Sequence, residues 1–300
     1  MHLKGFLSYI QFEKRFSKHT LDAYRSDLSQ FSAYIAEKHN SDDKDLTSIT
    51  HRQIRSWVVH LMNEKRTPKS VNRKISTLKT YYKYLLRKGA IKKNPMLKVV
   101  APKVAKPLPL FIDKKSIQEI FNLFDKYPAS TEKDKFIRIR DLFIVELLYG
   151  TGIRRSELLG LKENSFDLKN KTIRVLGKGN KEWLLPMVNN LKDILRQYLE
   201  IKKNLFGDSV FLILSNAGQK AYPALIYRII HKLLSETSSL SRKSPHILRH
   251  TFATHLSNNG AELNAIKELL GHASLASTQI YTHNTIDKLK EIHRLAHPKA

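Results

Sequence analysis

The spacing of apolar residues predicts two helices within residues 1–62. The first carries an apolar stripe whose members recur at steps of three and four. They are Leu21, Tyr24, Leu28, Phe31 and Ile35. Ser17 and Thr20 are candidate capping residues at its start. The second helix is predicted over residues 54–62, where three apolar residues lie on one side.

A third helix is predicted between two strong end signals. Thr67 is a capping residue, and Pro68 suits the first helical position. Gly89 suits the position just after the last turn. The apolar stripe of this helix consists of Val71, Ile75, Leu78, Tyr82 and Leu85.

The other sides of the third helix are basic. They carry Lys69, Arg73, Lys74, Lys79 and Lys83. A face of this kind is ordinarily a solvated surface. The alternative is a helix that lies against DNA phosphates or enters the major groove. The candidate DNA contacts are then Lys69, Arg73, Lys74 and Lys79.

Residues 101–110 divide the chain. They contain three prolines, which cannot continue a helix and suit an extended, fairly stiff linker. We therefore predict an N-terminal helical domain over residues 1–100 and a C-terminal domain over residues 111–300.

The C-terminal domain is predicted to be mostly α with a small antiparallel sheet. A β-prone run at 172–176, turn residues at 177–180 and a return at 181–186 indicate a hairpin. Helices are predicted over 115–125, 139–148, 155–161, 191–203, 224–234, 247–258, 261–270 and 277–283. The fold class is therefore mainly α, with two domains.

The chain is strongly basic, which narrows the class of its partner. Its 53 lysines and arginines against 27 acidic residues give a formal net charge of +26. Such an excess implies a polyanion, and nucleic acid is favoured over a membrane surface because the apolar runs are short. There is no cysteine, so disulfides and thiolate metal sites are excluded. The N-terminus has no signal-peptide core, and a cytoplasmic location is expected.

Six residues of the second half could together attack a phosphodiester: Arg154, Lys178, His246, Arg249, His272 and Tyr281. Two guanidiniums can hold one phosphate and offset the charge of a pentacoordinate transition state. Lys178 could protonate the departing 5′ oxygen. Tyr281 could be the nucleophile, although its ordinary pKa of about 10 means that it needs a base. A tyrosine that attacks phosphate becomes covalently joined to DNA, so the reaction can be reversed.

The two histidines supply the remaining functions. His246 could accept the phenolic proton, and His272 could hydrogen-bond the phosphate or brace the site. Taken singly, each residue also has an ordinary structural interpretation, such as a salt bridge between Arg154 and Glu157. His246 and His250 have zinc-protease spacing, but the glutamate of that motif is missing, so no metal is expected.

Five segments resemble the Xer-type tyrosine recombinases of the phage integrase family in order and spacing. They are 151–158, 177–182, 244–255, 269–272 and 278–283. The six residues match the family's catalytic set position by position. The resemblance implies a two-domain DNA clamp, with an N-terminal core-binding domain and a C-terminal catalytic domain. It also implies two-step transesterification through a 3′-phosphotyrosine, without a metal or a high-energy cofactor.

The same resemblance implies partners. Four protomers, as a homo- or hetero-tetramer, would act on two double-stranded DNA sites, with half of them active at a time. A C-terminal segment would dock on a neighbour, and the candidate stripe is Ile286, Leu289, Ile292 and Leu295. Two positions depart from the family: Arg155 follows the first arginine, where a small apolar residue is common, and Trp183 replaces a common arginine.

The leading hypothesis is a recombinase that resolves chromosome dimers, together with a related Xer-type recombinase and a septal DNA translocase. Three alternatives stay open: an integrase of a mobile element, a type IB topoisomerase, and a non-catalytic DNA-binding protein of the same fold.

Overall fold

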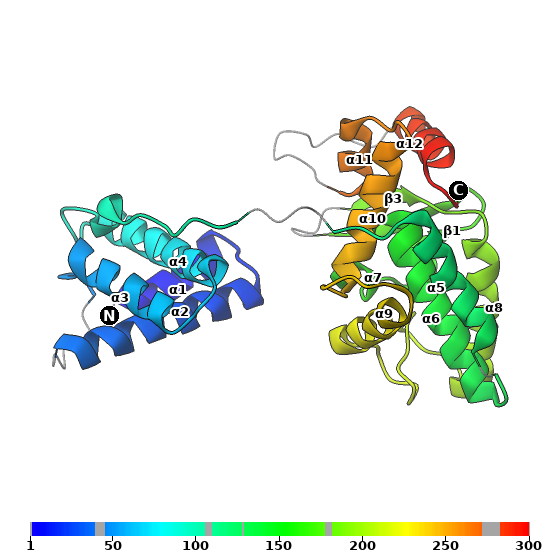
Figure 1. Ribbon diagram of the computed structural model, residues 1–300, viewed down its shortest axis with the longest axis horizontal. Coiled ribbons are helices and arrows are strands. Elements are labelled where there is room, and N and C mark those ends of the chain that lie inside the picture. Colours follow the sequence, from blue (N-terminus) through cyan, green and yellow to red (C-terminus); the bar gives the residue numbers. More distant parts are fainter. Residues whose placement is uncertain are drawn as a thin grey trace. The chain divides into compact units, whose positions relative to one another are not determined.

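The chain forms two compact units, residues 1–107 and residues 108–300 (Figure 1). The structure, a computed structural model, describes residues 2–39, 46–105, 110–127, 129–177, 182–271 and 283–299. The junction at Pro107 falls within the proline-containing stretch 101–110.

The first unit is built from helices. In chain order they are α1 (His2–Ser8), the π-helical turn η1 (Tyr9–Glu13), α2 (Lys18–His39), α3 (His51–Asn63), α4 (Pro68–Arg87) and the 3-10 turn η2 (Pro95–Lys98). The predicted end signals of α4 are confirmed: Thr67 Oγ1 accepts a hydrogen bond from the Ser70 amide, and Gly89 has a φ of 69°. Ser17 likewise accepts from the Thr20 amide at the start of α2.

Large aromatic side chains fill the core of the first unit. Phe6, Phe31, Trp57, Tyr81 and Tyr82 are almost completely buried there. The rings of Phe31 and Trp57 lie 4.9 Å apart and join α2 to α3. Because an aromatic side chain buries about 150–250 Å², a few of them stabilise a small helical domain.

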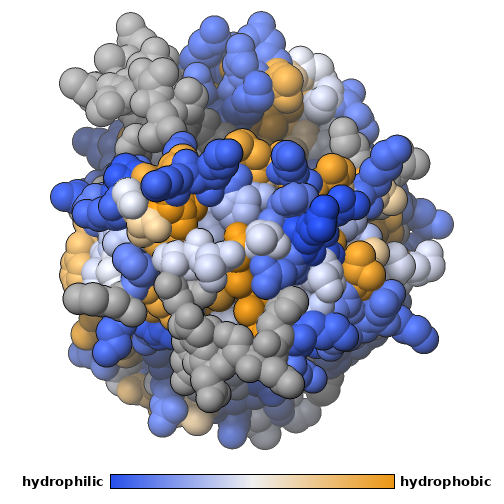
Figure 2. All heavy atoms as spheres, turned by 90° about the vertical axis from the view of Figure 1, so that its left-hand side faces the viewer, coloured by the Kyte–Doolittle hydropathy of each residue, from blue (hydrophilic) through white to orange (hydrophobic). Residues whose placement is uncertain are grey.

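The surface in Figure 2 is mostly hydrophilic, with apolar residues in small, separate patches. None of the described helices is long and apolar enough to span a membrane.

The second unit surrounds the buried helix α6. Its helices are α5 (Lys114–Lys126), α6 (Glu132–Thr151), α7 (Arg155–Leu158), α8 (Leu191–Phe206), α9 (Pro223–Thr237), α10 (Pro245–Asn258), α11 (Leu263–Leu269) and α12 (His283–Ala296), with a 3-10 turn η3 (Glu163–Ser165). Helices α5, α8, α9 and α10 all pack against α6 (Figure 1). Its length exceeds the predicted 139–148 because a Thr131–Asp134 capping box starts it earlier.

A small antiparallel sheet lies beside these helices. Its strands are β1 (Phe166–Asp167), β2 (Thr172–Leu176) and β3 (Glu182–Pro186), paired in the order β1-β2-β3. Ile173 pairs with Leu185 and Val175 pairs with Trp183, and all four side chains are buried. The alternation of the hairpin therefore turns one face into the core, as its sequence predicted.

Helix α12 folds back onto its own chain. It packs against β3, α10 and α11. His293 and His297 donate Nε2–H to the Gly150 and Tyr149 carbonyls at the end of α6, at 2.8 and 3.2 Å. Ile286 and Leu289 are buried, and only Leu295 of the predicted docking stripe is largely exposed. The stripe was expected to dock on a neighbour. This expectation is corrected for Ile286 and Leu289, because other parts of the same chain bury them.

Candidate active site

Arg154 is held in a fixed direction at the exit of α6. The helix ends at Gly152, whose φ of 64° is easily adopted only by glycine, and the chain then turns into α7. Glu157 binds Arg154 twice: its Oε2 accepts from the backbone amide at 2.9 Å and its Oε1 from Nη1 at 2.6 Å. Glu157 is buried, whereas the Arg154 side chain is about one-third exposed. The carboxylate therefore anchors one edge of the guanidinium and leaves the side chain partly open to a ligand.

Arg249 joins the two segments that flank the site. It projects from α10, and its Nη1 donates to the Gly152 carbonyl at 2.7 Å. Its Nη2 donates to the Leu270 carbonyl, just after α11, at 2.6 Å. Both carbonyls are at helix ends, where intrahelical partners are lacking. The planar fork of arginine therefore fixes the segment before Arg154 relative to the segment before His272.

The two guanidiniums lie close enough to affect each other. Burial, followed by the positive charge of Arg154, lowers the pKa of Arg249 to about 10, while Glu157 acts in the opposite direction. Arg249 therefore stays charged at neutral pH, beside a second cation. Two like charges held together by their surroundings make a binding site for an anion with several oxygens.

His246 lies in the first turn of α10, one turn before Arg249. The residue is exposed overall, but its pKa is lowered, first by partial desolvation of the ring and then by electrostatic repulsion from Arg155, His250, Arg249 and Arg154. The imidazole is therefore neutral at pH 7 and able to accept a proton. Arg155, which stands where a small apolar residue is common in the family, supplies one of the positive charges near His246.

Three of the six predicted residues lie outside the described residues: Lys178, His272 and Tyr281. Gly177, which directly precedes Lys178, and Gly271, which directly precedes His272, are both described. The structure thus brings Arg154, His246 and Arg249 together, and the other three stay predictions. Within the described ranges, no three metal-ligating side chains meet, and His250 is exposed.

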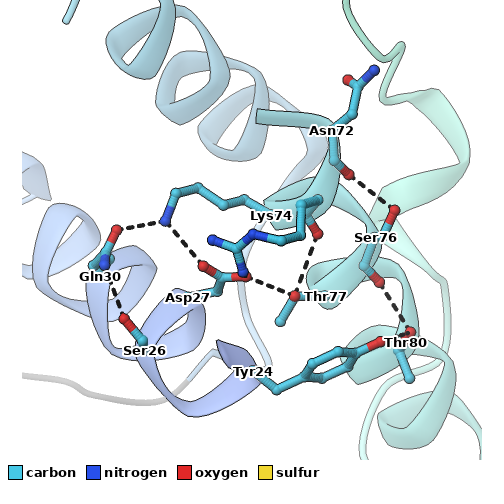
Figure 3. Close-up of polar contacts among 10 residues, drawn as sticks. Tyr24, Ser26, Asp27, Gln30, Asn72, Lys74, Ser76, Thr77 and Thr80 are labelled. Atoms are coloured by element: carbon cyan, nitrogen blue, oxygen red, sulfur yellow. Dashed lines mark hydrogen bonds and ion pairs between the residues drawn. The ribbon is translucent and has the colours of Figure 1, made fainter. Parts of the chain in front are cut away.

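The basic helix α4 divides its cations between surface and core. Lys69, Arg73 and Lys79 are exposed, whereas Lys74 is only 5% exposed. Lys74 Nζ donates to Asp27 Oδ1 at 3.0 Å and to Gln30 of α2 (Figure 3). Lys74 is therefore part of the core and is not available to DNA. The prediction of Lys74 as a DNA contact is corrected. A buried lysine within a basic run has no local sequence signal.

Asp27 is the centre of this internal network. It is completely buried and also accepts from Thr77 Oγ1 at 2.9 Å (Figure 3). Arg73 Nη1 donates to the same carboxylate. Sequence reasoning missed it because a single aspartate on an amphipathic helix resembles any surface carboxylate. Its partners lie 46 to 50 positions further along the chain.

Comparisons with known proteins cover both units. A family model described as "Phage integrase family" matches residues 111–288. A second, described as "Phage integrase, N-terminal SAM-like domain", matches residues 3–89. The chain belongs to the phage integrase family.

Curated relatives extend over almost the whole chain. It is 34% identical over 317 residues to the tyrosine recombinase XerC of Chlorobaculum parvum, covering 99% of this chain and 94% of that protein. It is 37% identical over 303 residues to the XerC of Thermodesulfovibrio yellowstonii, covering 99% and 96%. The chain is thus a tyrosine recombinase, as its motifs predicted.

Two solved structures share the fold. The XerH site-specific recombinase bound to its difH substrate aligns with a TM-score of 0.68 at 22% identity, covering 90% of this chain and 78% of that one. The Tn1549 transposon integrase in complex with circular intermediate DNA aligns with a TM-score of 0.68 at 17% identity, covering 96% and 98%. These likenesses and the helical structure confirm the predicted fold class.

Proposed function

We propose that this recombinase cuts and rejoins DNA at a specific site through a 3′-phosphotyrosine on Tyr281. The observation that carries the proposal is the pair of guanidiniums at Arg154 and Arg249. One is anchored by a buried carboxylate and the other by two backbone carbonyls. This rigid, positively charged pair is suited to one phosphate group, and the charge that builds up in the transition state would strengthen the attraction.

The proposed reaction exchanges one phosphoester bond for another. The Tyr281 oxygen bonds to phosphorus, and the bond between phosphorus and the 5′ oxygen breaks. Lys178 gives its proton to that oxygen, which leaves as a hydroxyl group. In rejoining, a 5′ hydroxyl of another strand attacks the phosphotyrosine, and Tyr281 leaves as the phenol. Because the bond energy is kept in the covalent intermediate, the reaction needs no high-energy cofactor.

His246 is proposed to receive the phenolic proton. Partial desolvation and the neighbouring arginines lower its pKa, so the neutral, proton-accepting form is present at pH 7. His272 would hydrogen-bond the phosphate or brace the site.

A nicked suicide DNA site tests the chemistry. When Tyr281 attacks beside the nick, the short fragment diffuses away and the covalent complex accumulates. The native protein should yield this complex, and Tyr281→Phe should yield none. Absence of an adduct with the native protein, or an equal amount with the variant, contradicts the proposal. DNA binding without cleavage would identify a binding protein that retains the fold.

The two units are proposed to divide the work. Residues 1–100 would bind the core of the DNA site, with Lys69, Arg73 and Lys79 as phosphate contacts, and residues 111–300 would carry the chemistry. The stretch 101–110 would join them. Relaxation of plasmids without any specific site would instead favour a topoisomerase.

The biological role follows as a further part of the proposal. A homo- or hetero-tetramer would act on two DNA sites in the cytoplasm and resolve chromosome dimers, together with a related Xer-type recombinase and a septal DNA translocase. Two curated relatives that span nearly the whole chain are named XerC. Sequencing the DNA recovered from trapped covalent complexes tests this role. A single chromosomal site would support it, and the ends of a mobile element would favour an integrase.

A further inference from the structure

Trp183 lies between two segments that lead into proposed catalytic residues. It belongs to β3, is 7% exposed, and pairs with Val175 of β2. Its indole abuts both Gly177 and Gly271. Gly177 directly precedes Lys178, and Gly271 directly precedes His272. A single side chain therefore contacts both segments.

The indole leaves no room for a side chain at either glycine. A Cβ atom added at Gly177 would lie 2.2 Å from Trp183 Cζ3, and one added at Gly271 would lie 2.7 Å from Cζ2. These separations are far below the optimal distance of about 3.5–4.0 Å between carbon atoms. Gly271 has a φ of 62°, which by itself favours glycine, but Gly177 has no positive φ. At Gly177, then, it is the indole that excludes a side chain.

Among the residues that the structure describes, the indole is held by packing alone. Its Nε1 is buried and has no hydrogen-bond partner among the residues that the structure describes. A buried donor without a partner costs about 1–3 kcal/mol. A purely apolar side chain would fill a core position without this cost. Within the described part of the chain, core packing alone therefore does not account for an indole at this position.

We propose that Trp183 is a positioning residue that holds the backbone leading into Lys178 beside the segment leading into His272. The inference rests on the proposed function, in which Lys178 is the general acid. Lys178 must reach the departing 5′ oxygen at the moment the bond to phosphorus breaks. A displacement of about 1 Å can slow a reaction by roughly 10²-fold. The indole packs against both glycines and so holds the backbone directly before Lys178.

The leaving group separates this role from a purely structural one. When the bridging 5′ oxygen is replaced by sulfur, the departing group is a thiolate, whose conjugate acid has a pKa of about 8.5. Because it can leave without being protonated, cleavage of the sulfur substrate does not need a general acid. A variant whose only defect is a misplaced Lys178 should therefore be slow on the oxygen substrate and much less impaired on the sulfur substrate.

The experiment compares Trp183→Leu with Phe143→Leu in the full-length protein. Phe143 is completely buried in the core of the same unit, with its ring 5.3 Å from that of Tyr198. The rate of covalent adduct formation is measured with oxygen and sulfur suicide substrates. Trp183→Leu should slow the oxygen substrate about 10- to 100-fold and the sulfur substrate far less. Phe143→Leu should affect both substrates equally.

A second variant keeps the inference testable if Trp183→Leu folds poorly. Gly177→Ala adds one methyl group beside the turn, where it collides with the indole. It should show the same selective loss on the oxygen substrate. Equal slowing of both substrates by Trp183→Leu and Gly177→Ala would overturn the positioning role.

Lys178→Ala distinguishes this failure from a failure of the proposed function. Selective loss on the oxygen substrate by Lys178→Ala identifies the lysine as the general acid, whatever the variants of Trp183 and Gly177 do. If Lys178→Ala slows both substrates equally, its proposed role is wrong, and the positioning role that rests on it is overturned as well.

Discussion

The two units each hold a pair of neighbouring cations with one buried carboxylate, yet they use them in opposite ways. In the first unit, Asp27 accepts from Lys74 (Figure 3) and also from Arg73. In the second, Glu157 binds Arg154, whereas Arg249 donates to two carbonyls, which have no net charge.

The difference shows how the same residue types produce either a structural network or a binding site. The buried carboxylate of Asp27, with a hydroxyl group completing its contacts, compensates the charge of the buried Lys74, while the half-exposed Arg73 binds it from the surface. A carboxylate on one cation and two carbonyls on the other fix the directions of both guanidiniums. Arg155 brings a third positive charge close to His246. The second arrangement suits a phosphate, and the first suits a folded core.

The largest effect is expected when the buried carboxylate of Asp27 is neutralised. Asp27→Asn keeps the shape but leaves the buried Lys74 without its counter-ion. Breaking a buried ion pair in this way typically costs about 3–5 kcal/mol. The free energy of unfolding of the first unit, measured by denaturant titration of the full chain, should fall by this amount.

A double variant controls for this interpretation. Asp27→Asn combined with Lys74→Met removes both buried charges, and most of the lost stability should return because an apolar replacement of a buried pair is often neutral. If the double variant is as unstable as Asp27→Asn, the cluster is not held by charge compensation.

Substitutions at Arg154 and Arg249 should reduce the rate of catalysis more than they reduce the stability of the fold. Arg249→Lys keeps the charge but lacks the planar fork that reaches both carbonyls. We expect adduct formation to slow by roughly 10²–10³-fold, as for loss of one oxyanion donor. Single-turnover rates at saturating DNA measure this, with Arg196→Lys on the exposed side of α8 as the matched control. An unchanged rate would exclude Arg249 from the proposed site.

Acid should weaken the second unit through the buried imidazole of His297, which directly follows α12. Burial, together with the neighbouring His293, lowers the pKa of His297 to about 3. In the unfolded chain the His297 ring therefore binds a proton at about pH 6.5, whereas in the folded chain it binds one only at about pH 3. The stability contributed by neutral His297 is complete above pH 6.5 and is lost as the pH falls toward 3.

The expected slope gives this effect a measurable size. Between these pH values the free energy of unfolding should fall by up to about 1.4 kcal/mol per pH unit on account of this one group. Urea titrations of the native protein and of His297→Phe at several pH values isolate it, because the variant lacks the titrating ring. Parallel pH profiles for the two proteins would contradict the prediction.

The smallest effect separates surface from buried lysines on α4. A plot of the logarithm of DNA affinity against the logarithm of salt concentration has a negative slope. Lys79→Met should make this slope less steep by about 0.9 and leave the free energy of unfolding unchanged. Lys74→Met, its buried counterpart, should change stability and leave the salt slope unchanged. A shift in salt slope for Lys74→Met, or none for Lys79→Met, would reverse the assignment of the two residues.

Local signals allowed much of the fold to be predicted. Thr67 and Pro68 mark the start of α4 and Gly89 its end, because capping and backbone preferences act over a few residues. The β2–β3 hairpin follows from alternation around turn residues. The order and spacing of the motifs placed the chain in its family. For the site, however, the sequence nominated residues without revealing how they are supported.

Tertiary structure decided what each polar residue does. Lys74 and Lys79 look alike in the sequence, and only Asp27, more than 40 positions away, makes one of them a core residue. Trp183 looks like any strand tryptophan until Gly177 and Gly271 are seen to abut it. The apolar stripe of α12 predicted a docking surface, but packing within the chain buries Leu289. Periodicity and caps are local properties of a chain, whereas burial of a charge or a ring depends on partners that only folding brings together.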